Sequence, residues 1–280
     1  MKSSGAAAGY RVHALPDFLP ELERGESGGP PGCRLLAADR KTLIWAQRLE
    51  GDIPAVVKMN RHRGGISWQR GKCFRFRVQR EFDALTFLDG QGVPCSRPIF
   101  WSYGCGPHFG RCEILATREI ENATPLDAIL AVPEPPDIGP ALLAAYGLVR
   151  RMHERGCHHG LMFARNILVT RRGAQTPDAY IIDTPNAILF PGADLTGTKM
   201  AWIDLYFLTA SVMKHAGAEA CLAPLRHYGL GPGAIGKLVD HVITRRLSRL
   251  AKNLFRLECE TWELAARVGM RCWRSHRLRG

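Results

Sequence analysis

The amino-acid sequence predicts an α+β fold in which an antiparallel sheet with one helix is followed by a mostly helical part. Between residues 33 and 117 lie several short apolar or β-branched runs bounded by polar turns, as is typical of paired strands. Beyond Thr124, apolar residues recur three or four positions apart, which is the spacing of one face of a helix. The 280-residue chain is 46% hydrophobic and 23% charged, so it has enough apolar side chains for a core and is not disordered.

The first part is expected to hold five strands and one helix. Polar turns separate three short runs that predict an antiparallel meander, at residues 33–37, 42–48 and 53–59. Apolar residues recur three or four apart over 74–88, which predicts a helix that ends before Gly90. Two further runs, 99–103 and 111–117, predict a strand pair joined by a Gly-Cys-Gly-Pro turn at 104–107.

The second part is expected to be helical apart from one small hairpin. Helical periodicity marks four segments, which are residues 126–131, 141–155, 201–215 and 234–273. Two brief strand-like runs, 166–170 and 179–182, are linked by a turn that contains Arg-Arg-Gly. They predict the hairpin near the junction of the two parts.

These elements suggest three consecutive regions. Residues 24–32 are rich in glycine and proline and cannot bury apolar surface, so we expect an N-terminal arm over 1–32. A sheet-rich lobe over 33–116 precedes a helical lobe over 117–280, which ends in a basic helical tail. No apolar run approaches the roughly 18 to 20 residues that cross a bilayer, and the N-terminus lacks the features of a signal peptide. We therefore expect neither a spanning nor a secreted protein.

Cysteine and histidine usage points to a reducing compartment without a dedicated transition-metal site. The nine cysteines are scattered and include no Cys-x-x-Cys pair, so we expect reduced thiols in a cytoplasmic protein. The ten histidines include His153, His158 and His159, but no His-Glu-x-x-His spacing accompanies them.

Lys58 and Glu81 are the first candidates for chemistry. Lys58 ends the run Pro-Ala-Val-Val-Lys, and Glu81 lies 23 residues later on the predicted helix. A lysine at the end of a buried strand is costly unless an anion meets it, and a carboxylate on the next helix is the natural partner. Taken alone, each is an ordinary charge. Together they predict a pair that holds an ammonium group against nucleotide phosphates.

The segments 152–169 and 180–183 follow the order of a protein-kinase-like catalytic core. A histidine, His159, precedes Asn166 and an apolar strand, and a second apolar strand ends in Asp183. Oxygen ligands at the ends of two paired strands suit Mg²⁺, so we assign Asn166 and Asp183 as its ligands. The Trp-Ile-Asp-Leu sequence opens the helix expected at 201–215, and we assign its Asp204 the structural role of bracing the catalytic loop.

With these landmarks, roughly residues 33–215 resemble the Kdo/WaaP (InaA-like) lipopolysaccharide kinase family. Besides the catalytic loop, five short sequences carry the resemblance: Arg-Lys-Thr at 40–42, Val-Val-Lys-Met-Asn-Arg-His-Arg-Gly-Gly at 56–65, Gln-Arg-Glu-Phe-Asp-Ala-Leu at 79–85, Gly-Val-Pro at 92–94 and Thr-Arg-Glu-Ile at 117–120.

The resemblance implies a bilobal protein-kinase-like fold with an antiparallel-sheet N-lobe and a helical C-lobe. It implies a phosphotransferase that uses ATP and Mg²⁺ to phosphorylate heptose or Kdo sugars of the lipopolysaccharide inner core. It places Thr117 and Glu119 where the fold hinges and binds adenine, and it places the protein at the cytoplasmic face of the bacterial inner membrane.

The sequence departs from the family pattern at the position of the catalytic base. Leu161 stands five residues before Asn166, where an active kinase carries the aspartate that accepts the hydroxyl proton. The turn at 37–42 also contains no glycine, so Arg40, Lys41 or Thr42 would have to contact the phosphates.

Two alternatives therefore remain open. One is a sugar kinase with atypical chemistry in which His158 or His159 accepts the proton, because positioning and charge neutralisation dominate phosphoryl transfer. The other is a pseudokinase that binds nucleotide and serves a scaffolding or regulatory role in envelope biogenesis.

Basic residues are concentrated in two blocks. Residues 61–80 contain seven lysines and arginines and no acidic residue, and residues 245–280 contain ten against three glutamates. The net charge of the chain is +12. Such blocks favour an anionic partner, and we expect lipopolysaccharide core phosphates and anionic membrane headgroups rather than nucleic acid, for which no binding motif is present. Residues 243–273 are expected either to lie on a membrane surface or to pack as a helix on the lobe.

Overall fold

The computed structural model describes residues 33–39, 41–62, 69, 76–106, 110–132, 138–170 and 177–244. It separates into two compact units. Of the described residues, the first unit holds those up to Phe82 together with Arg97–Glu119, and the second holds Asp83–Ser96 and those from Ile120 onward. The arm expected at 1–32, Arg40, most of the basic block at 61–80 and the basic tail at 245–280 lie outside the described residues.

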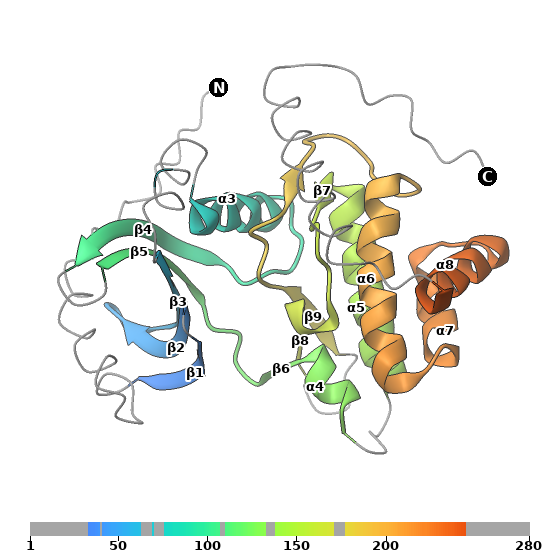
Figure 1. Cartoon of the computed structure of the whole chain (residues 1–280), viewed down its shortest axis with the longest axis horizontal. Helices are drawn as coiled ribbons and strands as arrows, with labels where there is room; N and C mark the ends of the chain where they lie inside the picture. Colours follow the sequence, from blue (N-terminus) through green and yellow to red (C-terminus); the bar gives the residue numbers. More distant parts are fainter. Residues whose placement is uncertain are drawn as a thin grey trace. The chain divides into compact units, whose positions relative to one another are not determined.

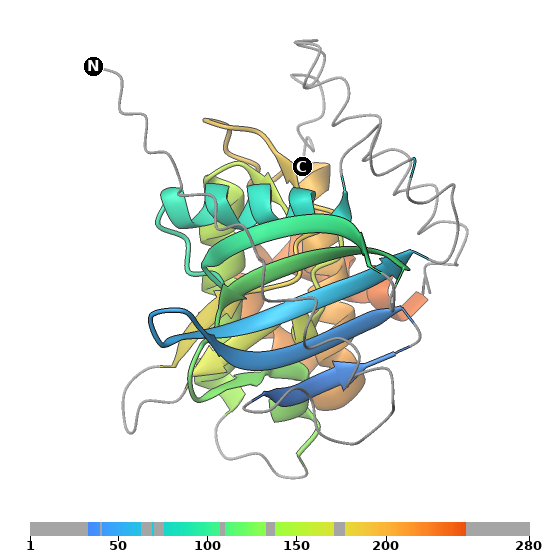
Figure 2. The same cartoon turned by 90° about the vertical axis from the view of Figure 1, so that its left-hand side faces the viewer.

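A five-stranded antiparallel sheet forms the first unit (Figure 2). The strands lie side by side in the order β1-β2-β3-β5-β4, and their bounds are β1 Arg34–Ala38, β2 Thr42–Leu49, β3 Ile53–His62, β4 Pro98–Gly106 and β5 Gly110–Arg118. The predicted meander and the predicted strand pair are therefore confirmed. The strand pair extends into the turn expected at 104–107, because Gly104 and Gly106 still pair with Cys112 and Gly110 of the neighbouring strand.

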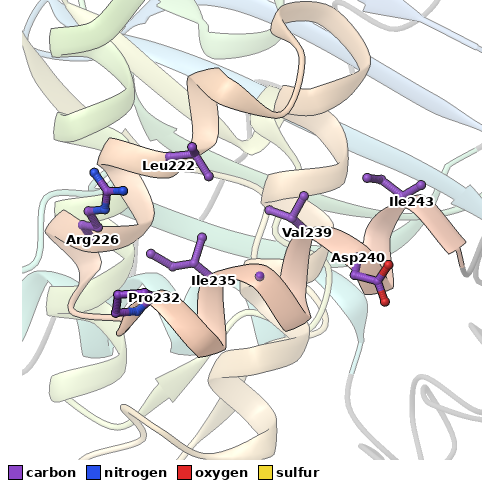
Figure 3. Close-up of a pocket in the computed structure, with 8 residues that line it drawn as sticks. Leu222, Arg226, Pro232, Ile235, Val239, Asp240 and Ile243 are labelled. Carbon is purple, nitrogen blue, oxygen red and sulfur yellow. The ribbon is translucent and has the colours of Figure 1, made fainter.

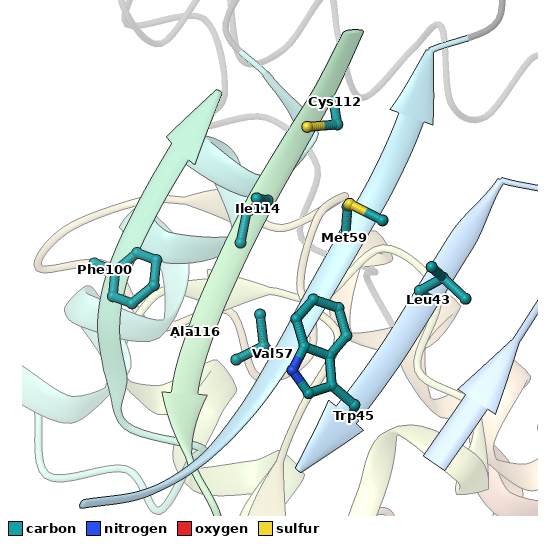
Figure 4. Close-up of a cluster of buried hydrophobic side chains, with 8 residues drawn as sticks. All are labelled: Leu43, Trp45, Val57, Met59, Phe100, Cys112, Ile114 and Ala116. Carbon is teal, nitrogen blue, oxygen red and sulfur yellow. The ribbon is translucent and has the colours of Figure 1, made fainter. Parts of the chain in front are cut away.

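One face of this sheet is apolar (Figure 4). Its side chains alternate along four strands, as the two-residue period of a strand requires, and they are Leu43, Trp45, Val57, Met59, Phe100, Cys112, Ile114 and Ala116. Each is at most 8% exposed. Lys58 lies between Val57 and Met59 in β3, so its side chain belongs to the opposite face.

The predicted helix is α3, which spans Arg77–Gly90, with residues 74 and 75 outside the described part. It ends at Gly90 rather than before it. Gly92 follows with a φ of 70°, and the Val93 amide donates to the carbonyl of Leu88 at 2.9 Å, which closes the helix end. The Val78 amide near the start of α3 donates to the Glu113 carboxylate of β5 at 3.2 Å.

Helices form most of the second unit (Figure 1). Their bounds are α4 Leu126–Leu130, α5 Ile138–Glu154, α6 Lys199–Ala216, α7 Glu219–Tyr228 and α8 Pro232–Thr244. The first three match the predicted segments. The helix predicted over 234–273 is described only as far as Thr244, and α7 was not predicted. Pro224 lies inside α7, where proline removes one backbone hydrogen bond and hides the helical signal in the sequence.

Short strands position the connections between these helices. The predicted hairpin is formed by β8 Ile167–Thr170 and β9 Asp178–Ile181, which are antiparallel, and β6 Ala123–Pro125 extends it on the β8 side. A second antiparallel pair, not predicted, joins β7 Cys157–His158 to β10 Ile188–Leu189. The segment that follows the hairpin is thereby held against the chain that leaves α5.

A surface pocket of about 340 Å³ lies between α7 and α8 (Figure 3). Apolar side chains such as Leu222, Ile235 and Val239 line it, with Arg226 and Asp240 as its charged members. None of the predicted site residues lines this pocket. Within the described part of the chain, no helix combines the length and the hydropathy that a membrane crossing requires.

Candidate active site

Lys58 and Glu81 form an ion pair inside the first unit. The Lys58 ammonium lies 2.9 and 3.0 Å from the two carboxylate oxygens of Glu81. The Lys58 side chain is 14% exposed and that of Glu81 4%, so this is not a solvated surface pair. Removing either partner would leave a charge in a place with little water, which is why the pair is energetically important. The structure thus brings together two residues that the sequence predicted as partners.

The turn between β1 and β2 is closed by an acidic side chain. Asp39 Oδ1 accepts hydrogen bonds from the backbone amides of Lys41 and Thr42 at 2.6 and 2.7 Å. These bonds hold the pKa of Asp39 below its usual range. The Thr42 hydroxyl donates to Asn60 Oδ1 at 3.1 Å, and Arg40 lies outside the described residues. Two amides of the expected phosphate-contacting turn are therefore occupied by a carboxylate of the same chain.

Thr117 and Glu119 lie at and just beyond the end of β5. Thr117 is buried and pairs with Val56 of β3. The Glu119 carboxylate accepts a hydrogen bond from Arg34 of β1 at 2.6 Å, and the Glu119 amide donates to the carbonyl of Pro54 at 3.0 Å. The first unit therefore holds this segment against the ends of β1 and β3.

Asn166 and Asp183 flank the open end of the β8–β9 hairpin in the second unit. The Ile182 amide donates to the carbonyl of Asn166 at 3.0 Å, so the residues that follow β9 lie beside those that precede β8. Asn166 Nδ2 donates to the carbonyl of Leu161 at 3.0 Å, which leaves Oδ1 as the side-chain atom suited to a cation. Asp183 has a φ of 57°, a left-handed conformation that is strained for a residue with a side chain. Strain of this kind concentrates at functional sites.

Leu161 belongs to a loop held by its own backbone. Its carbonyl accepts from both the Asn166 side chain and the Phe163 amide. The short 3₁₀ helix Ala164–Asn166 then delivers Asn166 to the start of β8. Because the Leu161 side chain has no polar atom, it neither accepts a proton nor orients an alcohol.

The Asp204 carboxylate is the centre of a hydrogen-bond network that holds the catalytic loop, and we call this network the hub. Asp204 comes from α6, is fully buried and accepts four hydrogen bonds. Oδ2 accepts from the His159 amide at 2.7 Å and from the rings of His158 and His153 at 2.9 and 3.1 Å. Oδ1 accepts from the Gly160 amide at 2.9 Å. Two consecutive backbone amides of the loop are therefore fixed by one carboxylate.

The electrostatics of this hub keep Asp204 ionised. Burial by itself raises the pKa of a carboxyl group, but the neighbouring His158 and the hydrogen bonds from both histidine rings outweigh burial and hold the pKa of Asp204 well below its usual range. An ionised aspartate accepts hydrogen bonds at both oxygens, which suits the four donors that surround it.

Neither predicted proton acceptor reaches solvent. The rings of His158 and His159 are 0% and 1% exposed. His158 Nδ1 forms a hydrogen bond with Asp204 Oδ2 at 2.9 Å, and His159 Nε2 donates to the carbonyl of Ile182 at 3.2 Å. His159 Nδ1 is buried and has no hydrogen-bond partner among the described residues. Burial lowers the pKa of His159, so the ring is mostly neutral at pH 7. This placement corresponds to a structural role for both rings.

Two features of the loop were not anticipated. His153, from α5, forms a hydrogen bond with Asp204. Its place on the buried face of that helix was the feature of the sequence that could have predicted this role. Gly156 and Gly160 allow the segment after Asp183 to approach closely: a Cβ on Gly156 would lie 2.1 Å from the carbonyl oxygen of Phe190, and one on Gly160 would lie 2.8 Å from that of Asn186. Contacts of this kind have no signature in the sequence.

Solved structures with a protein-kinase-like fold resemble this chain. "WaaP in complex with acyl carrier protein" matches with a TM-score of 0.51 at 15% identity, over 82% of this chain and 88% of that chain. "Amicoumacin kinase hAmiN in complex with AMP-PNP, Ca2+ and Ami" matches with a TM-score of 0.50 at 11% identity, over 83% of this chain and 89% of that chain. At these identities the likeness concerns the fold, and the predicted bilobal protein-kinase-like fold is confirmed.

One family model matches part of the sequence. The model of the lipopolysaccharide kinase (Kdo/WaaP) family matches residues 66–189, a range that contains Glu81, Leu161, Asn166 and Asp183. The resemblance predicted from the sequence is thereby confirmed. No curated protein sequence matches the chain.

Proposed function

We propose that the protein binds ATP with Mg²⁺ and transfers its terminal phosphate to a heptose or Kdo sugar of the lipopolysaccharide inner core. The observation that carries the nucleotide part is the buried Lys58–Glu81 pair, because an ammonium fixed by a carboxylate is oriented to meet a phosphate. The family match, which covers the catalytic loop, supports the acceptor.

In this proposal Asn166 and Asp183 hold the metal ion. Their oxygens are the ligand type that Mg²⁺ prefers, and the 2.9 to 3.0 Å hydrogen bonds around Asn166 fix its position beside the end of β9. Bound magnesium would neutralise charge on the phosphates. The residues of the chain position the nucleotide, with Thr117 and Glu119 near the adenine and Lys58 at the phosphates.

The reaction proceeds without a base from the catalytic loop. Leu161 takes no proton, and His158 and His159 are buried and hydrogen-bonded. General-base assistance accelerates a reaction by roughly 10² to 10⁴, whereas positioning and electrostatic stabilisation provide most of the rate enhancement of phosphoryl transfer. We therefore expect slow transfer with the proton leaving to solvent. Contact with an anionic membrane through the basic blocks would hold the protein near a lipid-linked acceptor.

A pseudokinase is the second candidate, and two observations favour it. The catalytic base is missing at Leu161, and Asp39 places a negative charge on the amides of the β1–β2 turn where phosphates would be held. Such a protein would bind nucleotide weakly and would transfer no phosphate. Its scaffolding or regulatory role would depend on the conformation that it adopts with nucleotide bound.

Nucleotide binding is tested by thermal unfolding. ATP·Mg²⁺ at about 100 times its dissociation constant stabilises the folded state by about 2.7 kcal/mol. We expect that stabilisation to disappear in Lys58→Met and in Asp183→Asn. It should persist in the control Lys237→Met, at an exposed lysine of α8. An unchanged melting temperature of the wild-type protein in saturating ATP·Mg²⁺ would contradict the nucleotide site.

Transfer is tested with radiolabelled ATP and core-truncated lipopolysaccharide. We expect label above the Asp183→Ala background in the wild-type protein, and a rate increase of about 100-fold in Leu161→Asp, which restores a base. If only Leu161→Asp transfers label, the wild-type protein is a pseudokinase. If no variant does so, the acceptor assignment is wrong.

A further inference from the structure

A buried tyrosine extends the hydrogen-bond network of the catalytic loop into α7. The Tyr228 hydroxyl lies 2.8 Å from His153 Nδ1, and His153 Nε2 lies 3.1 Å from Asp204 Oδ2. The ring of His153 is 0% exposed and Tyr228 is 3% exposed. A continuous path therefore runs from the end of α7 through His153 and Asp204 to the amides of His159 and Gly160.

The chemistry of the three groups assigns the protons along this path. Asp204 is ionised and accepts only, so the proton between it and His153 belongs to Nε2. The tautomer that donates from Nε2 and accepts at Nδ1 matches both neighbours, since Asp204 accepts at one side of the ring and Tyr228 offers a hydroxyl group at the other. Tyr228 retains its proton, because burial raises the pKa of its hydroxyl group. Its O–H therefore donates to Nδ1 and selects the tautomer that donates to Asp204.

The position of Tyr228 is well defined by its helix. It is the last residue of α7, and Gly229 ends the helix in the left-handed region with a φ of 108°. The rings of Tyr228 and His153 meet edge to face, with centroids 5.8 Å apart. Because α7 packs against α5, the hydroxyl is delivered to His153 by contacts between these two helices.

We propose that Tyr228 is a positioning residue for the loop at residues 158–161, acting through His153 and Asp204. By holding the His153 ring in one tautomer and one orientation, it keeps the Asp204 carboxylate in the place where it binds two consecutive loop amides. The consequence for phosphate transfer rests on the proposed function, whereas the consequence for the loop itself does not.

The first test measures the histidine tautomers by nitrogen-15 NMR of the imidazole rings. In the wild-type protein His153 is expected to carry its proton on Nε2, with Nδ1 as an acceptor. In Tyr228→Phe the Nδ1 signal should shift toward that of a nitrogen without a hydrogen bond, while Tyr146→Phe should leave it unchanged. Tyr146 is the matched control, because its buried hydroxyl contacts Thr209 at 3.1 Å and not the hub. A wild-type ring protonated on Nδ1 alone overturns the proposal.

The second test measures hydrogen exchange at the loop amides. Tyr228→Phe should accelerate exchange of the His159 and Gly160 amides about tenfold relative to Tyr146→Phe, after correction for any change in global stability. In the His153→Gln background, which removes the Nδ1 acceptor, Tyr228→Phe should have no further effect. Equal exchange in the two tyrosine variants, or an undiminished effect in the His153→Gln background, would refute the path.

The third test applies to transfer activity. Tyr228→Phe is expected to lower kcat about tenfold, with KM for ATP unchanged, which is the low end of the 10- to 100-fold loss seen when a hydrogen-bond partner that orients a metal ligand is removed. If the wild-type protein transfers no phosphate, the proposed function fails while the spectroscopic and exchange results still decide the role of Tyr228. A raised KM with unchanged kcat would contradict the positioning role.

Discussion

Replacement of Asp204 by asparagine is the most informative perturbation of the catalytic loop. The carboxylate accepts four hydrogen bonds in a fully buried place, three at Oδ2 and one at Oδ1. In Asp204→Asn one oxygen becomes an NH₂ group, which donates. The less costly orientation places this group at Oδ1, where it opposes only the Gly160 amide.

The expected magnitude follows from these contacts. One buried donor without a partner costs about 1 to 3 kcal/mol. The other three bonds change from charge-assisted to neutral, which weakens each by about 1 kcal/mol. We therefore expect Asp204→Asn to lower the free energy of unfolding by about 4 to 6 kcal/mol at pH 7. Asp194→Asn, at an exposed aspartate that accepts from Thr196, should cost less than about 1 kcal/mol.

Urea denaturation as a function of pH gives the assay. Because the pKa of Asp204 is lower in the folded than in the unfolded protein, its stabilising contribution is complete above the unfolded pKa of about 4. It is lost as the pH falls from there toward the folded value. The difference between the wild-type protein and Asp204→Asn should therefore be constant from pH 5 to 7 and shrink below about pH 4. A difference under about 1 kcal/mol at pH 7, or one that grows on acidification, would refute this reasoning.

Two further substitutions test the packing around the site. Gly156→Ala should lower the free energy of unfolding by about 3 kcal/mol or more, because the new Cβ would lie 2.1 Å from the Phe190 carbonyl oxygen. The control Gly192→Ala, at a similar φ but with no atom within 4 Å of the new Cβ, should lower it by about 1 kcal/mol. Equal losses in denaturant melts would contradict the clash. Met59→Ala, at a fully buried side chain of the apolar face, should lower the free energy of unfolding by about 2 to 5 kcal/mol. The control Leu35→Ala, at a residue that is 42% exposed, should stay within about 1 kcal/mol of the wild-type protein. Similar denaturation midpoints for the two variants would show that this face is not packed.

Much of the fold was predictable because its signals are local. Strand alternation and helical spacing are properties of neighbouring residues, and they identified five strands of the first unit and helices α4, α5 and α6 within a few residues. Helix α7 was missed because Pro224 imitates a helix end. The strand pair β7–β10 was missed because each strand has only two residues, too few for a period to show.

The candidate site was predictable where chemistry demands a partner. A buried lysine such as Lys58 needs an anionic partner, and Glu81 on the following helix was the natural choice. Lys58 Nζ lies 2.9 Å from Glu81 Oε2. The positions of Asn166 and Asp183 at the ends of a hairpin follow from the apolar runs beside them. The burial of His158 and His159 was not visible in the sequence, because a histidine suits both a solvated and a structural role.

By itself, the amino-acid sequence determined most of the longer strands and helices, the family resemblance and the presence of leucine at position 161, since each depends on residue type at a short spacing. Only the tertiary structure decided that Asp39 occupies the amides of its own turn and that Asp204 collects four donors. It also joined Tyr228 to His153 across 75 residues. The physical reason is that such contacts depend on how helices pack, and packing brings together side chains whose separation along the chain carries no period.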